Sequence, residues 1–574
     1  MSSHANDHGG LSLTGRRWRA PALCDLRAGS QGEERPRWLV QLLAHRGMTG
    51  EAEVARHLAP SLASLDDPSR MADMAAAIEV LSRALREQRR IVVYGDYDVD
   101  GVCSTALLVE ALQKLGGTVE YYIPERKSEG YGLNAAAVQE LCAKANVLIT
   151  TDCGITACDE VALARALGCE VVIVDHHRVG SALPAANAAL DPHRADCAFA
   201  FKDLCATGVA FMLVCGLRRA LREAGWFASR TELDVRDSLD LVALATVADV
   251  VPLCGHNRVL VAAGLKRMGH RPRLGLAALC ATANILPAAL SSYDLGYKLG
   301  PRINARGRLD NAMQAVELML TRDETRARLL AALLDGANRE RREIEKTTLA
   351  AAVARLEQEP LDDCAAIVIE DASWHPGVLG LVATRLAKRY GRPAIVIGEG
   401  GKGSGRSAAG LDLHASIQAA SEHLVRFGGH AAAAGITILA PSLPAFRAAF
   451  TAEARRRLGA PPYVVELHPD LEVEATGLSL DMLPLIEQLA PFGQQNPAPL
   501  WVSRGLEVRS VRVVGGEHLK LTLAGTARLE AIAFGMGALA ERLPPRIDLA
   551  YRLERNTYGG RNTLELKVED IAAS

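Results

Sequence analysis

Between residue 91 and about residue 250, the hydrophobic positions alternate between two patterns. Short continuous apolar runs rich in β-branched residues are typical of buried strands, and they lie at 91–94, 118–123, 147–151 and 170–174. The segments between them have the length and spacing of helices, at 104–115, 134–145 and 157–167. Strands that alternate with helices predict a parallel sheet with helices on both faces, so we expect an α/β fold here.

The pattern divides the chain into five parts, of which this α/β part is the second and covers residues 91–320. Residues 1–90 have the amphipathic spacing of helices, and residues 321–360 form a charged stretch that favours a long connector of one or two helices. Residues 361–460 predict a second α/β domain. Residues 461–574 are rich in β-type residues, and their five predicted strands fit a small β-barrel. These strands lie at 506–514, 518–523, 529–534, 547–553 and 563–568.

Composition excludes several classes of protein. The polar N-terminus lacks the apolar region of a secretory signal, and no apolar run reaches the roughly 18 residues of a membrane span, so we expect a cytoplasmic protein without a membrane partner. Twelve cysteines without a CxxC pair predict reduced thiols rather than disulfides or a zinc ribbon. The net charge of −2 gives no general nucleic-acid signal, so any site for a polyanion must be built locally.

The first candidate site follows the strand at 91–94, in the sequence DYDVDG. Asp96, Asp98 and Asp100 bring three carboxylates together, and a hard divalent cation is the usual partner that relieves such repulsion. A solvated acidic turn is the simpler interpretation, but the strand before it should be buried. An EF-hand calcium loop would need a glutamate at its twelfth position, where this chain has Leu107.

Further carboxylates and imidazoles follow the other strands of the predicted sheet. Asp152 ends the third strand, Asp175, His176 and His177 end the fourth, and a later helix delivers Asp249. Ligands bind at the carboxyl ends of the strands in open parallel sheets. Several clusters that converge on one edge therefore indicate a metal site.

The types of ligand indicate which metal. Many oxygen ligands with one or two imidazoles favour Mn²⁺ or Mg²⁺ over zinc. The carboxylates exceed what one ion needs and predict two ions that share a bridging aspartate. Two metals activate water and stabilise the oxygens of a phosphoryl displacement. Adjacent side chains of a strand point to opposite faces, so one of His176 and His177 should ligate while the other supports it or contacts phosphate.

Two basic, glycine-rich stretches are candidates for phosphate binding. Residues 291–310 contain Arg302, Arg306 and Arg308, and Arg126 lies in PERKSEGYG. Arginine in a glycine-rich loop can approach a phosphate closely and bind it through two hydrogen bonds. The alternative is an ordinary solvated loop.

Four motifs in this chain resemble those of the DHH phosphoesterase superfamily. They are DYDVDG, TTDCGI, DHH and ATVADVVPL, in that order. Within the superfamily the chain most resembles the RecJ family of single-strand-specific exonucleases, also in IPERKSEGYGLN, LGPRINARGRLDNA and FGGHAAAAG. The resemblance implies a parallel-sheet DHH domain, a connector helix, a DHHA1 substrate domain and a C-terminal OB-fold.

The resemblance also implies roles for individual residues. Two Mn²⁺ or Mg²⁺ ions would be held by Asp96, Asp98, Asp100, Asp152, His176 and Asp249. The catalytic residues would be Asp98, Asp100, Asp152, His176 and His177. Among them, Asp152 would bridge the ions and His177 would contact phosphate. Many DHH phosphoesterases have a histidine where this chain has Tyr94, so the division of the ligands between the two metals stays open. The substrate would be bound by Arg126 at its 5′ end and by Arg302, Arg308, Ser404, Arg406, Gly429 and His430.

The function implied by the resemblance is 5′→3′ exonuclease activity on single-stranded DNA, with release of 5′-mononucleotides in DNA repair and recombination. A helicase and a single-strand-binding protein are the partners that the family implies. Two alternatives remain: a DHH enzyme that cleaves short oligonucleotides, cyclic dinucleotides or pyrophosphate, and a non-catalytic scaffold that binds single strands. The predicted β domain and the chain length argue against the first, and the intact motifs argue against the second.

Overall fold

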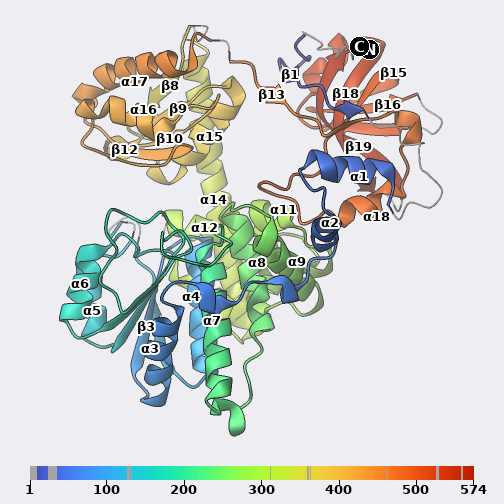
Figure 1. Cartoon of the computed structure of the whole chain (residues 1–574). Helices are drawn as coiled ribbons and strands as arrows, with labels where there is room; N and C mark the ends of the chain where they lie inside the picture. The colour runs from blue at the N-terminus through green and yellow to red at the C-terminus, as the bar shows by residue number, and fades with distance from the viewer. Residues whose placement is uncertain are drawn as a thin grey trace. The chain divides into compact units, whose positions relative to one another are not determined.

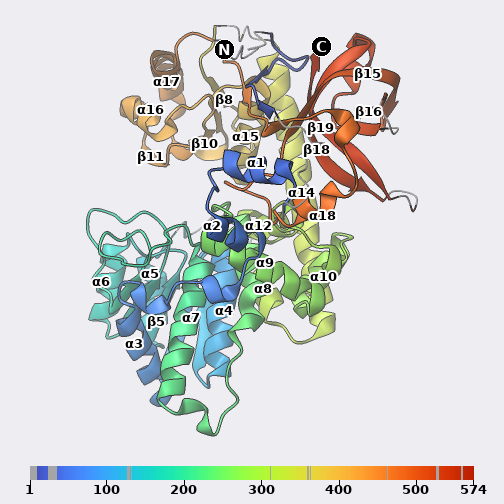
Figure 2. The same ribbon diagram turned by 45° about the vertical axis from the view of Figure 1, so that its right-hand side comes forward.

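The computed structural model forms two compact units (Figures 1 and 2). The parallel-sheet unit contains Arg56–Arg341 and Ala490–Pro497, and the barrel unit contains Met1–Ala55, Arg342–Leu489 and Ala498–Ser574. The structure describes residues 10–23, 35–125, 129–130, 132–309 (without the side chains of 308 and 309), 312–358, 361, 363–461, 463–524, 529–557, 560 and 562–574. None of the helices in these residues is long and apolar enough to span a membrane.

The parallel-sheet unit is built on five parallel strands in the order β4-β3-β5-β6-β7. They are β3 (Arg90–Gly95), β4 (Thr118–Tyr122), β5 (Val147–Thr151), β6 (Glu170–Val174) and β7 (Ala188–Leu190). Ile91 and Val93 of β3 contribute to one hydrophobic core, and Val92 and Tyr94 to another, as expected for a strand buried on both faces. The predicted parallel sheet is confirmed.

Helices cover both faces of this sheet. One core includes residues of α3 (Met74–Arg86), α4 (Val99–Lys114), α7 (Ala206–Glu223) and α8 (Leu239–Ala248). The other core includes residues of α5 (Ala135–Cys142) and α6 (Cys158–Ala166). Residues 96–98 join the end of β3 to the start of α4, and Asp152 and Asp175 directly follow β5 and β6, so the sequence motifs share the carboxyl edge of the sheet.

Residues 292–309 are helical, so the prediction of a glycine-rich loop at 291–310 is wrong for this part of the stretch. It comprises α11 (Ser292–Asp294), the π-helical turn η6 (Leu295–Leu299) and α12 (Gly300–Leu309). The widened π turn ends two residues before Pro301, which has no N–H for an ordinary helical hydrogen bond. Gly300 serves close packing, because a Cβ atom there would lie 3.4 Å from the Cβ atom of Ala248 in α8.

The predicted connector is one helix, α14 (Glu324–Leu356), of 33 residues. At 1.5 Å per residue it is about 50 Å long. Residues up to 341 belong to the parallel-sheet unit and the rest to the barrel unit. Ion pairs one turn apart, Arg328 with Glu324 and Arg339 with Asp335, use its many charged residues.

The barrel unit contains a second sheet and a closed barrel. The strands of the sheet have the order β11-β12-β10-β9-β8. They are β8 (Ile367–Glu370), β9 (Ala394–Ile397), β10 (Lys402–Arg406), β11 (Arg426–Gly429) and β12 (Ala433–Thr437). Helices α15 (Leu379–Tyr390) and α17 (Leu443–Leu458) pack against this sheet. The barrel consists of β15 (Trp501–Val514), β16 (His518–Leu523), β17 (Leu529–Ala533), β18 (Arg546–Asn556) and β19 (Thr563–Ala573). It closes because β15 pairs with both β16 and β18, as the predicted small barrel requires.

The first described residues form strands that the sequence analysis did not predict. β1 (Arg17–Trp18) pairs with β13 (Glu466–Leu467), and β2 (Ala22–Leu23) pairs with β14 (Leu471–Glu472). The following helix, α1 (Arg37–His45), places Trp38 edge-on against Trp501 of the barrel, with ring centroids 5.4 Å apart. Strands of two residues show no hydrophobic period, so only the long-range pairing reveals them.

Candidate metal centre

The carboxyl edge of the parallel sheet gathers seven side chains into three overlapping groups of potential metal ligands. The groups are Asp152 with His176 and His177, Asp100 with His176 and Asp249, and Asp96 with Asp98 and Asp152. Within each group one ligand atom per residue lies within 4.8 Å of the others. All six predicted metal ligands and His177 therefore lie together.

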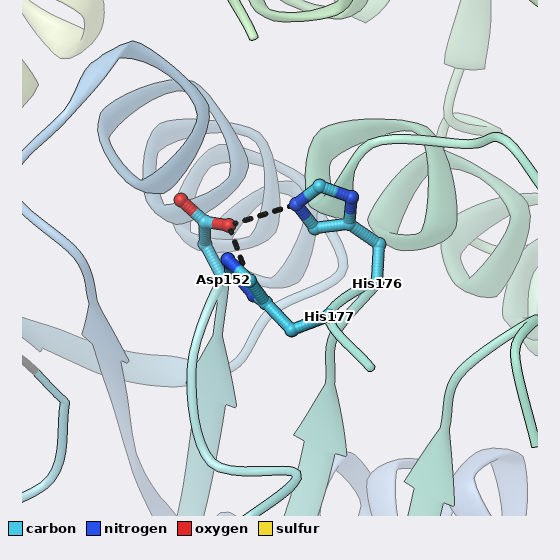
Figure 3. A group of neighbouring side chains, drawn as sticks. All are labelled: Asp152, His176 and His177. Carbon is cyan, nitrogen blue, oxygen red and sulfur yellow. Dashed lines mark ion pairs between the residues drawn. The ribbon is translucent and has the colours of Figure 1, made fainter. Parts of the chain in front are cut away.

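Asp152 is common to two of the groups. Its Oδ1 atom lies 3.3 Å from Nε2 of His176 and 3.9 Å from Nδ1 of His177, as the two dashed lines in Figure 3 show. The residue is buried and its backbone has the left-handed φ of +60°, which turns the chain sharply at the end of β5. This central place supports the hypothesis that Asp152 bridges two ions.

The surroundings of the His176 imidazole show that these residues fit a metal ion. Its Nε2 atom is buried and makes no hydrogen bond, yet it lies 3.3 Å from Asp152, 3.6 Å from Asp249 and 3.7 Å from Asp100. Burial lowers the pKa of His176 despite the surrounding carboxylates, which favours the neutral imidazole that ligates metals. The lone pair of Nε2 therefore faces three carboxylates without a hydrogen-bond donor, and a cation bound between them would be its partner.

The aspartates give the same indication. Burial raises the pKa of Asp152 well above its usual range, and the charges of Asp98, Asp100, Asp96 and Asp249 raise it further. Burial and the charges of Asp100 and Asp98 raise the pKa of Asp249 in the same way. So many ionised carboxylates are unfavourable at this spacing unless a positive charge lies between them. The donor set of carboxylates and imidazole fits Mn²⁺ or Mg²⁺.

Asp175 orients the two histidines, a role that the sequence analysis missed. Its Oδ1 atom accepts hydrogen bonds from the backbone N–H groups of His176 (2.8 Å) and His177 (3.2 Å) and lies 2.8 Å from Nδ1 of His177. Oδ2 accepts from the N–H of Ile155 at 3.0 Å. Its position as the first residue of the DHH triplet was the signal for this role.

The same contacts make His177 a cation. Burial opposes its protonation, but the hydrogen bond and the negative charge of Asp175 outweigh burial and raise the pKa of His177 to about 9. A protonated imidazole beside the centre suits the predicted contact with a phosphate oxygen better than a ligand role. The distinction between His176 as a ligand and His177 as a phosphate contact stays a prediction.

Asp98 and Asp100 also have structural partners. Asp98 caps α4, where its Oδ1 atom accepts from the N–H groups of Asp100 (2.9 Å) and Gly101 (3.1 Å). Asp100 accepts at the N-terminus of α7 from the N–H of Ala206 (2.6 Å) and from the N–H (2.8 Å) and hydroxyl (2.6 Å) of Thr207. These bonds fix both carboxylates before any ion binds.

Helix α12 supports the loop that carries the three aspartates. The side-chain oxygen of Asn304 accepts the N–H of Val99, between Asp98 and Asp100, at 3.0 Å. A Cβ atom at Gly307 would lie 2.6 Å from the carbonyl oxygen of Tyr97, so only glycine fits there. The segment that was predicted to bind phosphate therefore positions the segment that carries Asp96, Asp98 and Asp100.

Replacement of Asn304 by alanine should weaken metal binding. The change leaves the Val99 N–H without its acceptor and loosens the loop between Asp98 and Asp100. Residues that support metal ligands typically contribute about 10- to 100-fold in metal affinity or activity. Titration of activity with Mn²⁺ should show a higher half-saturating concentration, and a Mn²⁺ response equal to that of the unmodified protein would contradict this role.

Tyr94 does not take the place of a ligand. Its side chain is fully buried in the core below the sheet edge, and its hydroxyl donates to the carbonyl of Gly132 at 2.9 Å. Asp96 instead completes the third group of potential ligands, with Asp98 and Asp152.

The predicted phosphate-binding arginines of the parallel-sheet unit are engaged elsewhere or lie outside the described residues. Arg302 donates to Asp335 of α14 at 3.0 Å and to the carbonyl of Lys298 at 2.6 Å. Arg306 donates to the side chain of Gln314 at 2.7 Å. Arg126 and the side chain of Arg308 are outside the described residues.

The four substrate-binding candidates of the barrel unit share one end of the second sheet. Arg406 donates to the hydroxyl of Ser404 at 3.2 Å, and both side chains lie against Gly380 in the first turn of α15. Arg406 pairs in register with Ala433, and the exposed His430 makes a tight turn whose N–H donates to the Ala433 carbonyl at 2.8 Å. Gly429 has a φ of +143°, which favours glycine. Their role in binding stays a prediction.

Comparison with known proteins identifies the family. Three family models match: the DHH family N-terminal domain over residues 90–246, the DHHA1 domain over 362–456 and the RecJ OB domain over 469–570. The single-stranded-DNA-specific exonuclease RecJ of Dickeya dadantii is 39% identical over 557 residues, which cover 93% of this chain and 96% of that protein. The chain belongs to the RecJ family.

Solved RecJ structures share the fold. RecJ of Thermus thermophilus in complex with Mn²⁺ is 31% identical, with a TM-score of 0.83 over 97% of this chain and 80% of that one. The same protein in complex with Mg²⁺ is 30% identical, with a TM-score of 0.76 over 97% and 78% of the two chains. The predicted RecJ architecture of a DHH domain, a connector helix, a DHHA1 domain and an OB-type barrel is confirmed.

Proposed function

We propose that this protein is a metal-dependent exonuclease that degrades single-stranded DNA from the 5′ end and releases 5′-mononucleotides. The observation that carries the proposal is the carboxylate–imidazole centre at the sheet edge, in a chain that matches RecJ relatives over more than nine-tenths of its length. The relatives are named single-stranded-DNA-specific exonucleases. The 5′ polarity rests on the family resemblance alone.

Asp96, Asp98, Asp100, Asp152, His176 and Asp249 would hold two Mn²⁺ or Mg²⁺ ions. Two such ions supply an activated water molecule and stabilise the charge that develops on the phosphate oxygens. Asp98 and Asp100 need little reorganisation, because backbone donors already fix their carboxylates. The protonated His177, held by Asp175, would donate a hydrogen bond to a non-bridging phosphate oxygen.

The barrel unit would hold the rest of the strand. Ser404, Arg406, Gly429 and His430 form one end of the second sheet, where the guanidinium of Arg406 and the exposed His430 would bind phosphates. OB-type barrels bind single strands through basic and aromatic surfaces. Trp501 and Tyr551 of the barrel are buried, so base stacking on the barrel would fall to the exposed Phe534, with Lys567 5.9 Å from its ring centroid.

A role in DNA repair and recombination, action in the cytoplasm, and cooperation with a helicase and a single-strand-binding protein belong to this proposal as family implications. A helicase would supply the single strand that the nuclease consumes. None of the described residues identifies either partner.

A labelled oligonucleotide tests the proposed function. The strand carries its label at the 5′ or the 3′ end, is single-stranded or duplexed, and is incubated with Mn²⁺ or with a chelator. We expect the 5′ label to appear at once as mononucleotide, only from the single strand and only with metal. Cleavage of short oligonucleotides or pyrophosphate but not of the polymer would favour a small-substrate DHH enzyme, and binding without cleavage would favour a scaffold.

A further inference from the structure

Two tyrosines of the parallel-sheet unit expose their rings to solvent. Tyr293 in α11 is 59% exposed and Tyr297 in the π turn is 72% exposed. Among the described residues, the only other exposed aromatic side chain is Phe534 of the barrel. Their rings stack on each other, with centroids 4.9 Å apart and planes 27° from parallel. Both residues stay more than half exposed in this stack, so a base could reach them from solvent.

The segment that carries the tyrosines is held firmly in place. Ser291 and Asp294 form a reciprocal capping box, and Asp294 also pairs with Lys298 at 2.7 Å. The hydroxyl of Ser292 donates to the carbonyl of Phe492 at 2.6 Å. The rings therefore project from a rigid helical support, which reduces the entropy that binding would cost.

The same support contacts both halves of the metal centre. A Cβ atom at Gly296 would lie 3.3 Å from Cγ1 of Val247, two residues before Asp249. A Cβ atom at Gly300 would lie 3.4 Å from Ala248 and 3.8 Å from Cγ2 of Val99, the residue between Asp98 and Asp100. The π turn that carries Tyr297 thus packs against the end of α8, and the first residue of α12 packs against α8 and α4, the elements that present these metal ligands. π turns often mark functional sites.

We propose that Tyr293 and Tyr297 form a stacking platform for the bases of the single-stranded nucleic acid that the metal centre cleaves. The proposal rests on the proposed function and assigns a binding site to it. Stacking on tyrosine is independent of sequence because every base has a π face, which suits a nuclease that must accept any strand.

Substitution of the rings tests the platform in the full chain. Binding is measured in the Asp152→Asn background with Mn²⁺, so that the strand stays intact, and turnover is measured with Asp152 present. We expect Tyr297→Ala, and Tyr293→Ala together with it, to weaken binding of a single-stranded oligonucleotide by roughly 5- to 100-fold. Tyr297→Phe keeps the ring and should bind like the parent. Because the rings are exposed, the melting temperatures of all these variants should agree within a few degrees.

An oligonucleotide with abasic residues separates base stacking from other effects. On such a strand the parent protein should lose affinity, and Tyr297→Ala should cause no further loss. The matched control is Leu167→Ala, which removes another exposed apolar side chain of this unit, 47% exposed, just after α6 and away from the metal edge.

The outcomes distinguish the two proposals. If the parent degrades single strands and both tyrosine variants bind the normal strand as tightly as it does, the platform is wrong and the exonuclease stands. If Tyr297→Ala lowers the affinity for normal and abasic strands by the same factor, the rings do not stack on bases and the platform is wrong. The rings would then have a role in docking a protein or in shaping the metal centre. A parent that neither binds nor degrades single strands would overturn the proposed function and the platform with it.

Discussion

Asp152→Asn should lower nuclease turnover by at least about a hundredfold, because the contribution of a catalytic metal is several kcal/mol. Asp152 belongs to two of the three ligand groups, so its loss affects both proposed ions. The backbone at this position has a φ of +60°, a conformation that asparagine adopts more readily than most residues. The substitution therefore removes a negative charge and leaves the turn after β5 intact.

Stability should change in the opposite direction to activity. In the metal-free protein Asp152 is buried among other carboxylates, and its neutral replacement relieves their repulsion. We expect the metal-free variant to melt at a higher temperature than the metal-free parent. The control is Asp159→Asn, which changes an exposed aspartate in the first turn of α6 and should leave turnover unchanged. Retention of more than about a tenth of the activity by Asp152→Asn would remove Asp152 from the centre.

Removal of metal should abolish activity and make stability strongly dependent on pH. The folded-state pKa values of Asp152 and Asp249 lie well above that of an unfolded aspartate, about 4. Between these values the folded protein binds more protons than the unfolded chain, so the free energy of unfolding falls as pH rises. The stabilisation by protons is complete below about pH 4 and is lost as pH passes through the raised values.

Bound metal replaces those protons. Saturating Mn²⁺ stabilises the folded state by mass action, by about 4 kcal/mol at a thousand times its dissociation constant. The difference in melting temperature between Mn²⁺ and chelator should therefore be larger at pH 8 than at pH 5, where protons compete with the ion. Thermal melts over a pH series measure this difference. A difference that does not change with pH would contradict the assignment of these carboxylates to metal binding.

Sequence reasoning located the metal centre because two regularities apply there. Buried parallel strands are continuous β-branched runs, so 147–151 and 170–174 were predicted with the bounds that β5 and β6 have. The carboxyl ends of parallel strands share one edge of the sheet, so the residues that follow these strands lie close together wherever the helices pack. Asp152 and His176 came together for that reason.

Other features depend on contacts between distant parts of the chain and could not be predicted from a local pattern. Glycine and proline in 291–310 suggested a loop, but residues 300–309 form a helix whose Gly300 lies beside Ala248 of α8. Asn304 supports the metal loop through one hydrogen bond to Val99, and nothing in its own neighbourhood indicates this. The residues proposed to bind the strand have the weakest signal, because a site for a polymer is spread over many separate elements.

The pairing of the two ends of the barrel unit affects how the chain folds during synthesis. The N–H of Leu13 donates to the carbonyl of Ile571 at 2.8 Å, and β2 pairs with β14. Residues 13–23 therefore leave the ribosome about 550 residues before β19 is complete, which at 5–20 residues per second is roughly half a minute to two minutes. The parallel-sheet unit, continuous from 56 to 341 apart from its short second segment, gains its sheet long before. Until β13 and β14 have been synthesised, about 450 residues after β1 and β2, the edges of β1 and β2 have no partner in their own chain. A chaperone that covers these edges would protect the nascent protein from pairing with its neighbours.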